Sequence, residues 1–285
     1  MKILITGTSG YIGKQLVNKL QTENELYKVT RTVDKEATAG EFILWDMSTA
    51  PNLDNFPRDI DAVIHLAQSR NYRDLTTGAE DMFNVNVAST FSLIRHAVDR
   101  GVKYFCYIST GSVYESTGFP LEENNASTTP NTLLGASKYA AELLLHPFAQ
   151  RINIGILRLF MPYGPEQTDR LLSNLIYRVK NKQPITVATT GKGSVFATSY
   201  IDDVVDVIDT AVKNTWVGTY NIASRSNVSI QEMGELIGSM VNEQPVFERD
   251  TAAKLVYFVP DLSKIAKLYP VDNMLNFQQG LEKIL

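Results

Sequence analysis

Three glycines near the amino terminus have a spacing that suits the binding of a diphosphate. Gly7, Gly10 and Gly13 follow the apolar run 3–5 and open a segment of helical period. Glycines at such positions permit a tight turn, close approach of a pyrophosphate to the backbone, and close packing of helix on strand. The amino terminus of the helix adds N–H groups and positive dipole charge that favour phosphates. The sequence therefore predicts a dinucleotide-binding turn, with an ordinary turn and helix cap as the alternative.

Short β-branched runs alternate with stretches of helical period before and after this turn. The alternation predicts a parallel sheet with helices on both faces, which is an α/β fold. Aromatic residues at core spacings, Phe83, Phe91, Tyr104 and Phe105, are expected to pack inside, and Phe83 should share a helical face with residues 87, 94 and 98. The expected strands are 3–6, 27–33, 42–46, 62–67, 104–110 and 154–159, followed by helix 171–179, strand 185–188, a glycine turn at 191–193, helix 204–212 and strand 219–223.

Composition limits the classes of function. The chain has 285 residues, 44% of them hydrophobic, and 27 basic against 31 acidic residues give a formal charge of −4, which disfavours a nucleic-acid partner. Cys106 is the single cysteine and is expected to be an inert core residue. No apolar stretch is long enough to span a membrane, and the three histidines have no metal-like spacing. We therefore expect a soluble cytoplasmic protein with no metal site.

Several further segments, taken with the Gly-x-x-Gly-x-x-Gly spacing, resemble the extended short-chain dehydrogenase/reductase family of sugar-nucleotide epimerases, dehydratases and reductases. They occur in the order of the family across residues 7–204. The segments are 61–67 (DAVIHLA), 86–90 (NVAST), 109–114 (STGSVY), 135–138 (GASK), 157–165 (LRLFMPYGP) and 200–204 (YIDDV).

The resemblance implies a doubly wound Rossmann-type parallel sheet and a small, discontinuous C-terminal substrate domain. We expect the dinucleotide-binding domain to comprise residues 1–163 plus 199–224, and the small substrate domain 164–198 plus 225–285. Lys138 would hold the nicotinamide ribose, and Thr110 would hydrogen-bond the reacting oxygen of the substrate. The cofactor-binding residues implied are Gly7, Ser9, Gly10, Tyr11, Ile12, Gly13, Asp46, Met47, Leu66, Ala67, Asn86, Ser109 and Lys138.

The end of the second expected strand bears on the form of the cofactor. An acidic residue there bonds the ribose hydroxyls of NAD, whereas a basic residue accommodates the 2′-phosphate of NADP. Here Arg31 occupies the stretch and no carboxylate follows until Asp34, so NADP is expected over NAD, and a solvated arginine is the alternative. Asp46 resembles the family residue that meets the adenine; it could instead be a cap or turn residue.

The resemblance breaks at the proton donor. The family places a Tyr four residues before its Lys, so that both side chains lie on one helical face and the Tyr exchanges a proton with the substrate. Here Leu134 stands at that position, and Tyr139 points elsewhere around the helix. Tyr114 and Glu115 lie near Thr110 in the sequence, but none of these three is identifiable as a proton carrier.

Two weaker departures concern the substrate. Met161 replaces an Asn that commonly faces the sugar nucleotide in relatives, and residues 193–199 lack the Arg that pairs with its diphosphate. Arg170, Arg178 or Arg225 could substitute for that arginine.

The preferred interpretation is an NAD(P)-dependent epimerase, dehydratase or reductase that acts on a sugar or sugar nucleotide with a non-standard proton donor. A catalytically impaired dinucleotide-binding protein with a regulatory or structural role is the alternative, and Leu134 supports it directly. Family members often dimerise through two helices per subunit, so a homodimer through helices 83–99 and 134–148 is expected by analogy.

Overall fold

The computed structural model describes residues 1–31, 41–51, 56–72, 74–115, 120–124, 128–253 and 255–285. Two compact units form. Unit 1 comprises Met1–Glu115, Ser127–Arg158 and Val205–Tyr220, and unit 2 comprises Ser116–Ala126, Leu159–Val204 and Asn221–Leu285. Asp34 and the predicted strand residues 32–33 lie outside the described residues.

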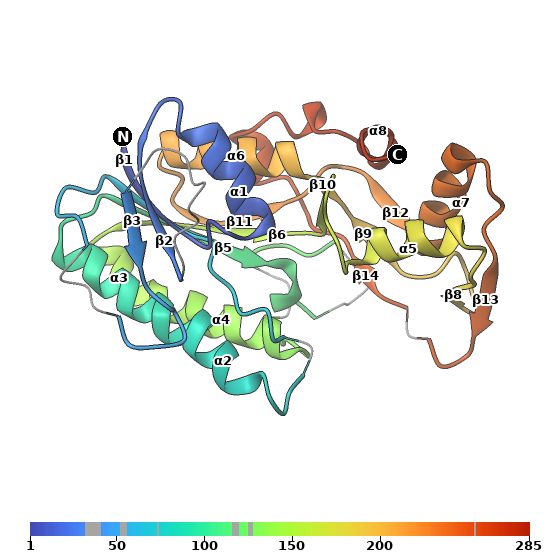
Figure 1. Cartoon of the computed structure of the whole chain (residues 1–285), viewed down its shortest axis with the longest axis horizontal. Helices are drawn as coiled ribbons and strands as arrows, with labels where there is room; N and C mark the ends of the chain where they lie inside the picture. Colours follow the sequence, from blue (N-terminus) through green and yellow to red (C-terminus); the bar gives the residue numbers. More distant parts are fainter. Residues whose placement is uncertain (32–40, 52–55, 73, 116–119, 125–127, 254) are drawn as a thin grey trace. The chain divides into compact units, whose positions relative to one another are not determined.

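A seven-stranded sheet in the order β11-β6-β5-β4-β1-β2-β3 forms the centre of unit 1 (Figure 1). The pairs β1–β2, β1–β4, β2–β3 and β4–β5 are all parallel. Helices α1 and α6 lie on one face of this sheet, and α2, α3 and α4 lie on the other. The predicted α/β fold with a doubly wound parallel sheet is therefore confirmed.

The elements of this unit follow the alternation seen in the sequence. In α1 the apolar residues Leu16, Val17 and Leu20 are buried, as their helical spacing predicts. The elements are β1 (Lys2–Thr6), α1 (Tyr11–Leu20), β2 (Glu25–Thr30), β3 (Glu41–Leu44), β4 (Ala62–His65), α2 (Ala79–Phe83), η2 (Asn84–Ala88), α3 (Ser89–Asp99), β5 (Tyr104–Thr110), η3 (Gly111–Val113), α4 (Leu133–Leu145), η4 (His146–Gln150), β6 (Asn153–Leu159), α6 (Ile201–Lys213) and β11 (Gly218–Ile222).

The expectation that Phe83 and Phe91 pack in the core is wrong. Their exposed fractions are 59% and 41%, whereas Tyr104 and Phe105 are buried as expected. The physical reason for Phe83 is that α2 and α3 are joined by η2, a π-helical turn. A π turn places an extra residue in the helix, so residues before it lose the α-helical phase of those after it. Phe91 lies after that turn on the outer face of α3, where its ring meets the Phe148 ring edge-on at 6.1 Å.

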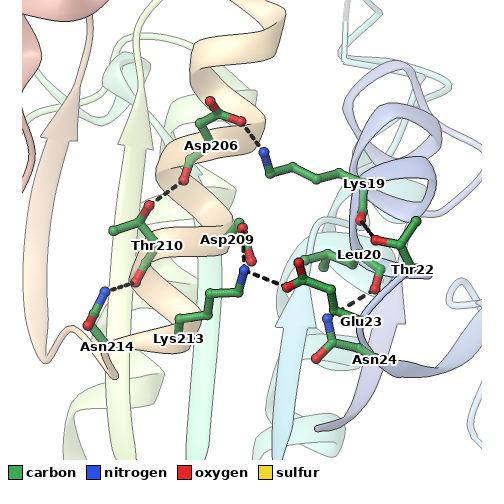
Figure 2. A network of polar contacts seen from close by, with 10 residues as sticks. All are labelled: Lys19, Leu20, Thr22, Glu23, Asn24, Asp206, Asp209, Thr210, Lys213 and Asn214. Atoms are coloured by element: carbon green, nitrogen blue, oxygen red, sulfur yellow. Dashed lines mark hydrogen bonds and ion pairs between the residues drawn. The ribbon is translucent and has the colours of Figure 1, made fainter.

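A network of charged side chains joins the ends of α1 and α6 on the outside of unit 1 (Figure 2). The Nζ of Lys19 lies 2.5 Å from Asp206 Oδ1, and the Nζ of Lys213 lies 2.9 Å from Glu23 Oε2 and 3.0 Å from Asp209 Oδ2. Most of these side chains are largely exposed. Because solvent and salt screen exposed pairs, this network contributes little to stability, and buried apolar packing holds α1 on the sheet.

Unit 2 contains short strands and helices rather than one large sheet. Its strands form a three-stranded sheet, β12-β9-β14, and two pairs, β10-β7 and β13-β8. The predicted helix 171–179, strand 185–188 and turn 191–193 correspond to α5, β8 and the segment preceding β9. The elements are β7 (Pro162–Tyr163), α5 (Leu171–Lys180), β8 (Ile185–Ala188), β9 (Val195–Ala197), β10 (Ser199–Tyr200), β12 (Asn227–Ser229), α7 (Ile230–Val241), β13 (Phe247–Asp250), β14 (Tyr257–Phe258), η5 (Ile265–Lys267), η6 (Val271–Asn273) and α8 (Phe277–Glu282).

Candidate functional site

The glycine turn between β1 and α1 is packed so closely that side chains do not fit at two of its positions. Gly7 has a φ of +73°, and a Cβ there would lie 2.8 Å from the backbone nitrogen of Ala67. A Cβ at Gly13 would lie 2.2 Å from the carbonyl oxygen of Gly7. The turn therefore lies directly on the chain that leaves β4 at Leu66 and Ala67, and its backbone can approach a ligand closely.

The amino terminus of α1 meets the requirements of a phosphate site. Gly10 is its N-cap, so no side chain caps the helix, and no acidic residue occurs in the first turn of this fully described element. The first-turn N–H groups, from Tyr11 to Gly13, have no intrahelical acceptors and carry the positive end of the dipole. Ser9 is exposed beside them, while Tyr11 and Ile12 are half-buried. These residues fit a dinucleotide diphosphate.

A chain of buried hydrogen bonds fixes this turn to its neighbours. The Ala67 N–H donates to Thr6 Oγ1 at 3.1 Å, and Thr6 Oγ1 lies 2.6 Å from His65 Nδ1. His65 Nε2 lies 2.8 Å from Thr90 Oγ1, which donates to the Asn86 carbonyl at 2.7 Å. Because Thr90 uses its proton on that carbonyl, His65 must donate from Nε2 and accept at Nδ1 from Thr6. The imidazole is therefore neutral and bonded at both nitrogens.

This arrangement makes stability depend on pH. Burial, aided by the Lys138 charge, lowers the pKa of His65 from 6.5 to about 3. Between these values the unfolded chain binds a proton that the folded chain does not, so stability falls as pH falls from 6.5 towards 3, by up to about 1.4 kcal/mol per pH unit. Urea unfolding across this window should show that slope, and His65→Gln should remove it. His146→Gln alters an exposed imidazole, so an equal loss of slope there would contradict the assignment.

Asn86 lies in η2 and links three segments of the site. Its Nδ2 donates to Ser137 Oγ on α4 at 2.9 Å, and its Oδ1 accepts from the Ser69 N–H at 2.9 Å. Its backbone carbonyl accepts from Thr90. All of these groups are buried, and π turns occur frequently at functional sites. Asn86 therefore holds α4 and the loop after β4 in place beside the glycine turn.

Lys138 is a buried residue of α4. Its exposed fraction is 1%, its Nζ donates to the Ile108 carbonyl at 2.7 Å, and it lies 4.7 Å from the centre of the Tyr107 ring. Burial lowers its pKa from 10.5 to about 7, and the charge of Glu142 opposes that change. Lys138 is thus held at the carboxyl end of β5.

Thr110 and Leu134 lie near Lys138 in the fold. Thr110 ends β5 half-buried, and its Oγ1 accepts from the Ser112 N–H at 3.1 Å, which leaves its own proton to donate. Leu134 is half-buried in the first turn of α4, and a Cβ on the adjacent Gly135 would lie 2.0 Å from the Ser112 carbonyl. Helix α4 therefore packs tightly on the segment after Thr110, and residue 134 lies one turn before Lys138.

Tyr114 is engaged elsewhere. Arg158 donates from Nη1 to its hydroxyl at 2.6 Å, and the phenol is 2% exposed. Glu115, in contrast, is exposed. The phenol of Tyr114 is thus held inside unit 1 by Arg158, and it does not replace a tyrosine at position 134.

The predicted adenosine-side residues lie just after β2 and just after β3. Arg31 is exposed just beyond β2, and its charge contributes to lowering the pKa of Asp46, although hydrogen bonds from Ser48 are the main cause. Asp46 Oδ1 accepts from the Ser48 N–H at 3.0 Å, so it stabilises a turn. Met47 is buried, and its sulfur lies 3.8 Å from Ser89 Oγ.

In unit 2, the residues considered for the substrate are mostly engaged locally. Met161 has a φ of 34°, which is uncommon for a residue other than glycine. Arg178 donates to the Pro184 carbonyl at 2.6 Å, and Arg225 pairs with Asp272. Arg170 is the N-cap of α5, and burial lowers its pKa.

Sequence reasoning missed two parts of this site. The polar chain through His65 was not predicted, and neither was a buried ion pair between Glu142 and Arg158. A signal for the latter was present, since Glu142 lies four residues after Lys138 on an otherwise apolar helical face. In the described part of the chain, no helix is long and apolar enough to cross a membrane.

Comparison with known proteins places this site in a family. A UDP-glucuronate 4-epimerase of Thermodesulfobacterium geofontis is 25% identical over 98% of this chain and 94% of its own. Two solved structures are each 24% identical to the chain. MoeE5 in complex with UDP-glucuronic acid and NAD has a TM-score of 0.87 and covers 100% of this chain and 97% of its own. A Bacillus cereus UDP-glucuronic acid 4-epimerase with the same two ligands has a TM-score of 0.86 and covers 99% of this chain and 97% of its own. The model of the NAD dependent epimerase/dehydratase family matches residues 3–223, and the chain belongs to that family.

Proposed function

We propose that the chain is an NAD(P)-dependent epimerase, dehydratase or reductase that acts on a sugar nucleotide. The observation that carries the proposal is the backbone cradle at Gly7 and Gly13, which adjoins Ala67 and opens onto the uncapped amino terminus of α1. Family membership adds the reaction class. When bound, the nicotinamide supplies hydride transfer. Within this chain, α1 binds the diphosphate, Lys138 holds the nicotinamide ribose, and the Thr110 hydroxyl orients the substrate oxygen.

The test is turnover by the purified wild-type chain. NADH, NADPH and their oxidised forms should be supplied with UDP-glucuronic acid, other sugar nucleotides and simple carbonyl compounds. Products must be followed by chromatography as well as by cofactor absorbance, because an epimerase returns its hydride and leaves no net absorbance change. A new sugar-nucleotide product supports the proposal. Tight cofactor binding without any product contradicts it and favours the second candidate.

That second candidate is a dinucleotide-binding protein with a regulatory or structural role. The specific observation in its favour is Leu134, an apolar side chain where the proton donor of the family is expected. In such a protein the cofactor would stabilise one conformation by binding the native state. Cofactor affinity alone does not separate the two candidates, whereas product formation does.

The form of the cofactor is expected to follow from Arg31. We infer a preference for NADP, because an exposed guanidinium just beyond β2 can pair with a 2′-phosphate. Arg31→Ala should weaken NADPH binding by about tenfold and leave NADH binding within about twofold, since the charge-assisted bonds lost are worth about 1.4 kcal/mol. Titration of intrinsic fluorescence with each cofactor measures both. Equal losses for the two cofactors, or tighter NADH binding by the wild type, would overturn the preference.

The substrate is expected to be a UDP-sugar, because the similar proteins act on or bind UDP-glucuronic acid. Met161 cannot supply the hydrogen bonds of the Asn that it replaces, and Arg178 and Arg225 have local partners. We therefore expect the bound sugar to make fewer polar contacts with this protein than with other family members. A cytoplasmic location stays a prediction of the sequence.

We also propose a homodimer through α2, α3 and α4. Large apolar side chains on these helices are exposed, including Phe83 at 59% and Leu143 at 51%, with Phe91 and Leu144 also above one third. Exposed apolar side chains of this kind are unfavourable in water and, where they form a patch, mark a protein–protein interface. Light scattering should give twice the chain mass, and Leu143→Glu should halve it because it places a charge in the interface. A monomeric wild type at micromolar concentration would exclude this dimer.

A further inference from the structure

Helix α4 presents two buried charges on one face. Lys138 and Glu142 lie four residues apart, and each is 1% exposed. Residues at this spacing are neighbours on a helix, and Leu134 precedes them by one more turn. Charged side chains are almost never fully buried without partners, so the contacts of Glu142 indicate what it does.

The Glu142 carboxylate joins α4 to two strands. Arg158 on β6 donates from Nη2 to Oε2 at 2.6 Å and from Nε to Oε1 at 3.1 Å, which is a forked arrangement. Ser109 on β5 donates its hydroxyl to the same Oε1. Arg158 also donates to the Tyr114 hydroxyl at 2.6 Å and lies 4.7 Å over its ring. Glu142 is therefore fixed in position, next to a predicted cofactor-binding residue.

Among the described residues near Lys138, Glu142 and its partner Arg158 carry charge. Tyr107 of β5 is below the Lys138 ammonium group, and His65 of β4 is neutral. The carboxylate of Asp81 on α2 accepts hydrogen bonds from Ser69 and Asn71, and the polar residue of η2 in this region is the uncharged Asn86. Burial brings the pKa of Lys138 down to about 7, and Glu142 is the group that opposes burial. Glu142 is therefore a charged neighbour that favours the protonated form of Lys138.

We propose that Glu142 is a positioning residue of the dinucleotide site: locked by Arg158, it holds Ser109 at the end of β5 and keeps Lys138 protonated for the cofactor ribose. The role in cofactor binding rests on the proposed function. The effect of Glu142 on Lys138 does not, because it is a property of the chain without any ligand.

The first readout is the protonation of Lys138 in the ligand-free chain. Carbon-13 NMR of labelled lysine, assigned with Lys138→Met, gives its titration midpoint. Glu142→Gln removes the charge and keeps the shape, but it leaves Arg158 buried without a counter-charge and can fail to fold. Glu142→Met combined with Arg158→Met removes both partners, which buried pairs often tolerate. Tyr114→Phe is the control, since it removes one hydrogen bond to Arg158 and no charge.

The expected result is a fall of the Lys138 midpoint by about one pH unit in Glu142→Gln, a smaller fall in the double variant because it also removes the positive charge of Arg158, and no shift in Tyr114→Phe. The second readout is the cofactor dissociation constant between pH 5.5 and 9. In Glu142→Gln binding should weaken about fivefold at pH 7, approach a tenfold loss above about pH 8 and converge with the wild type at the acidic end, where Lys138 is protonated in both.

Either of two outcomes would overturn the proposal. One is an unchanged Lys138 midpoint in a folded variant. The other is a loss of affinity that is equal at every pH, which is what a merely structural role produces. If the wild type binds no dinucleotide, the proposed function fails, while the NMR titration still decides whether Glu142 governs Lys138.

Discussion

Leu134→Tyr is expected to raise kcat by about 100-fold or more, since a positioned general acid contributes about 10²–10⁴ to a rate. Residue 134 is half-buried one turn before Lys138 on the same face of α4. A phenol there would lie beside the Lys138 amine, whose charge favours the phenolate and so aids proton exchange. The measurement is steady-state turnover of the sugar nucleotides over a range of pH.

Leu134→Phe is the matched control because it adds the same ring without a hydroxyl. It should leave kcat at the wild-type level. If the two variants behave alike, space at position 134 rather than proton transfer limits the rate. Activity that is absent in the wild type and present in Leu134→Tyr would identify the chain as a family member that lost its proton donor.

The second large effect is expected for Gly13→Ala, with a loss of about 2–4 kcal/mol in the free energy of unfolding. The new Cβ would lie 2.2 Å from the Gly7 carbonyl oxygen and 2.9 Å from the Cα of Thr8, and both are backbone atoms of the turn. The turn must therefore open, which moves the N–H groups of α1. Cofactor affinity should fall at least about tenfold in the same variant.

Gly101→Ala provides the comparison for this change. A Cβ there meets nothing within 4 Å, although the φ of +71° makes the residue strained. That variant should cost only about 1–2 kcal/mol and should leave cofactor affinity intact. Urea unfolding and fluorescence titration of both variants separate strain from the packing of the turn. A Gly13→Ala chain as stable as Gly101→Ala would show that the turn can open at little cost.

The sequence predicted the elements that bury a regular pattern of apolar residues. Strand β5 was predicted at its observed limits because every residue from Tyr104 to Ser109 is buried in a parallel sheet. Strand β2 begins at Glu25, before its predicted start, because it pairs with β1 from Lys2 onward. Phe83 was misplaced because a π turn changes the helical phase, and periodicity alone does not reveal such a turn.

The site was predicted where a local motif determines it, and missed where distant partners do. The glycine turn follows from local spacing. The burial of Lys138 does not, because it depends on β5 supplying the Ile108 carbonyl and the Tyr107 ring. The pairing of Glu142 with Arg158 likewise needs the positions of α4 and β6 in the fold, which no single-segment pattern contains.

The π turn at η2 also limits how the length of the chain can vary. Removing one residue from Asn84–Ala88 would restore an α-helical phase and rotate the preceding helix by about 100°. Phe83 would then turn towards the sheet, and Asn86 would no longer be placed to accept the hydrogen bond from Ser69 in the segment after β4. Helices α2 and α3 should therefore accept changes of side chain far more readily than insertions or deletions.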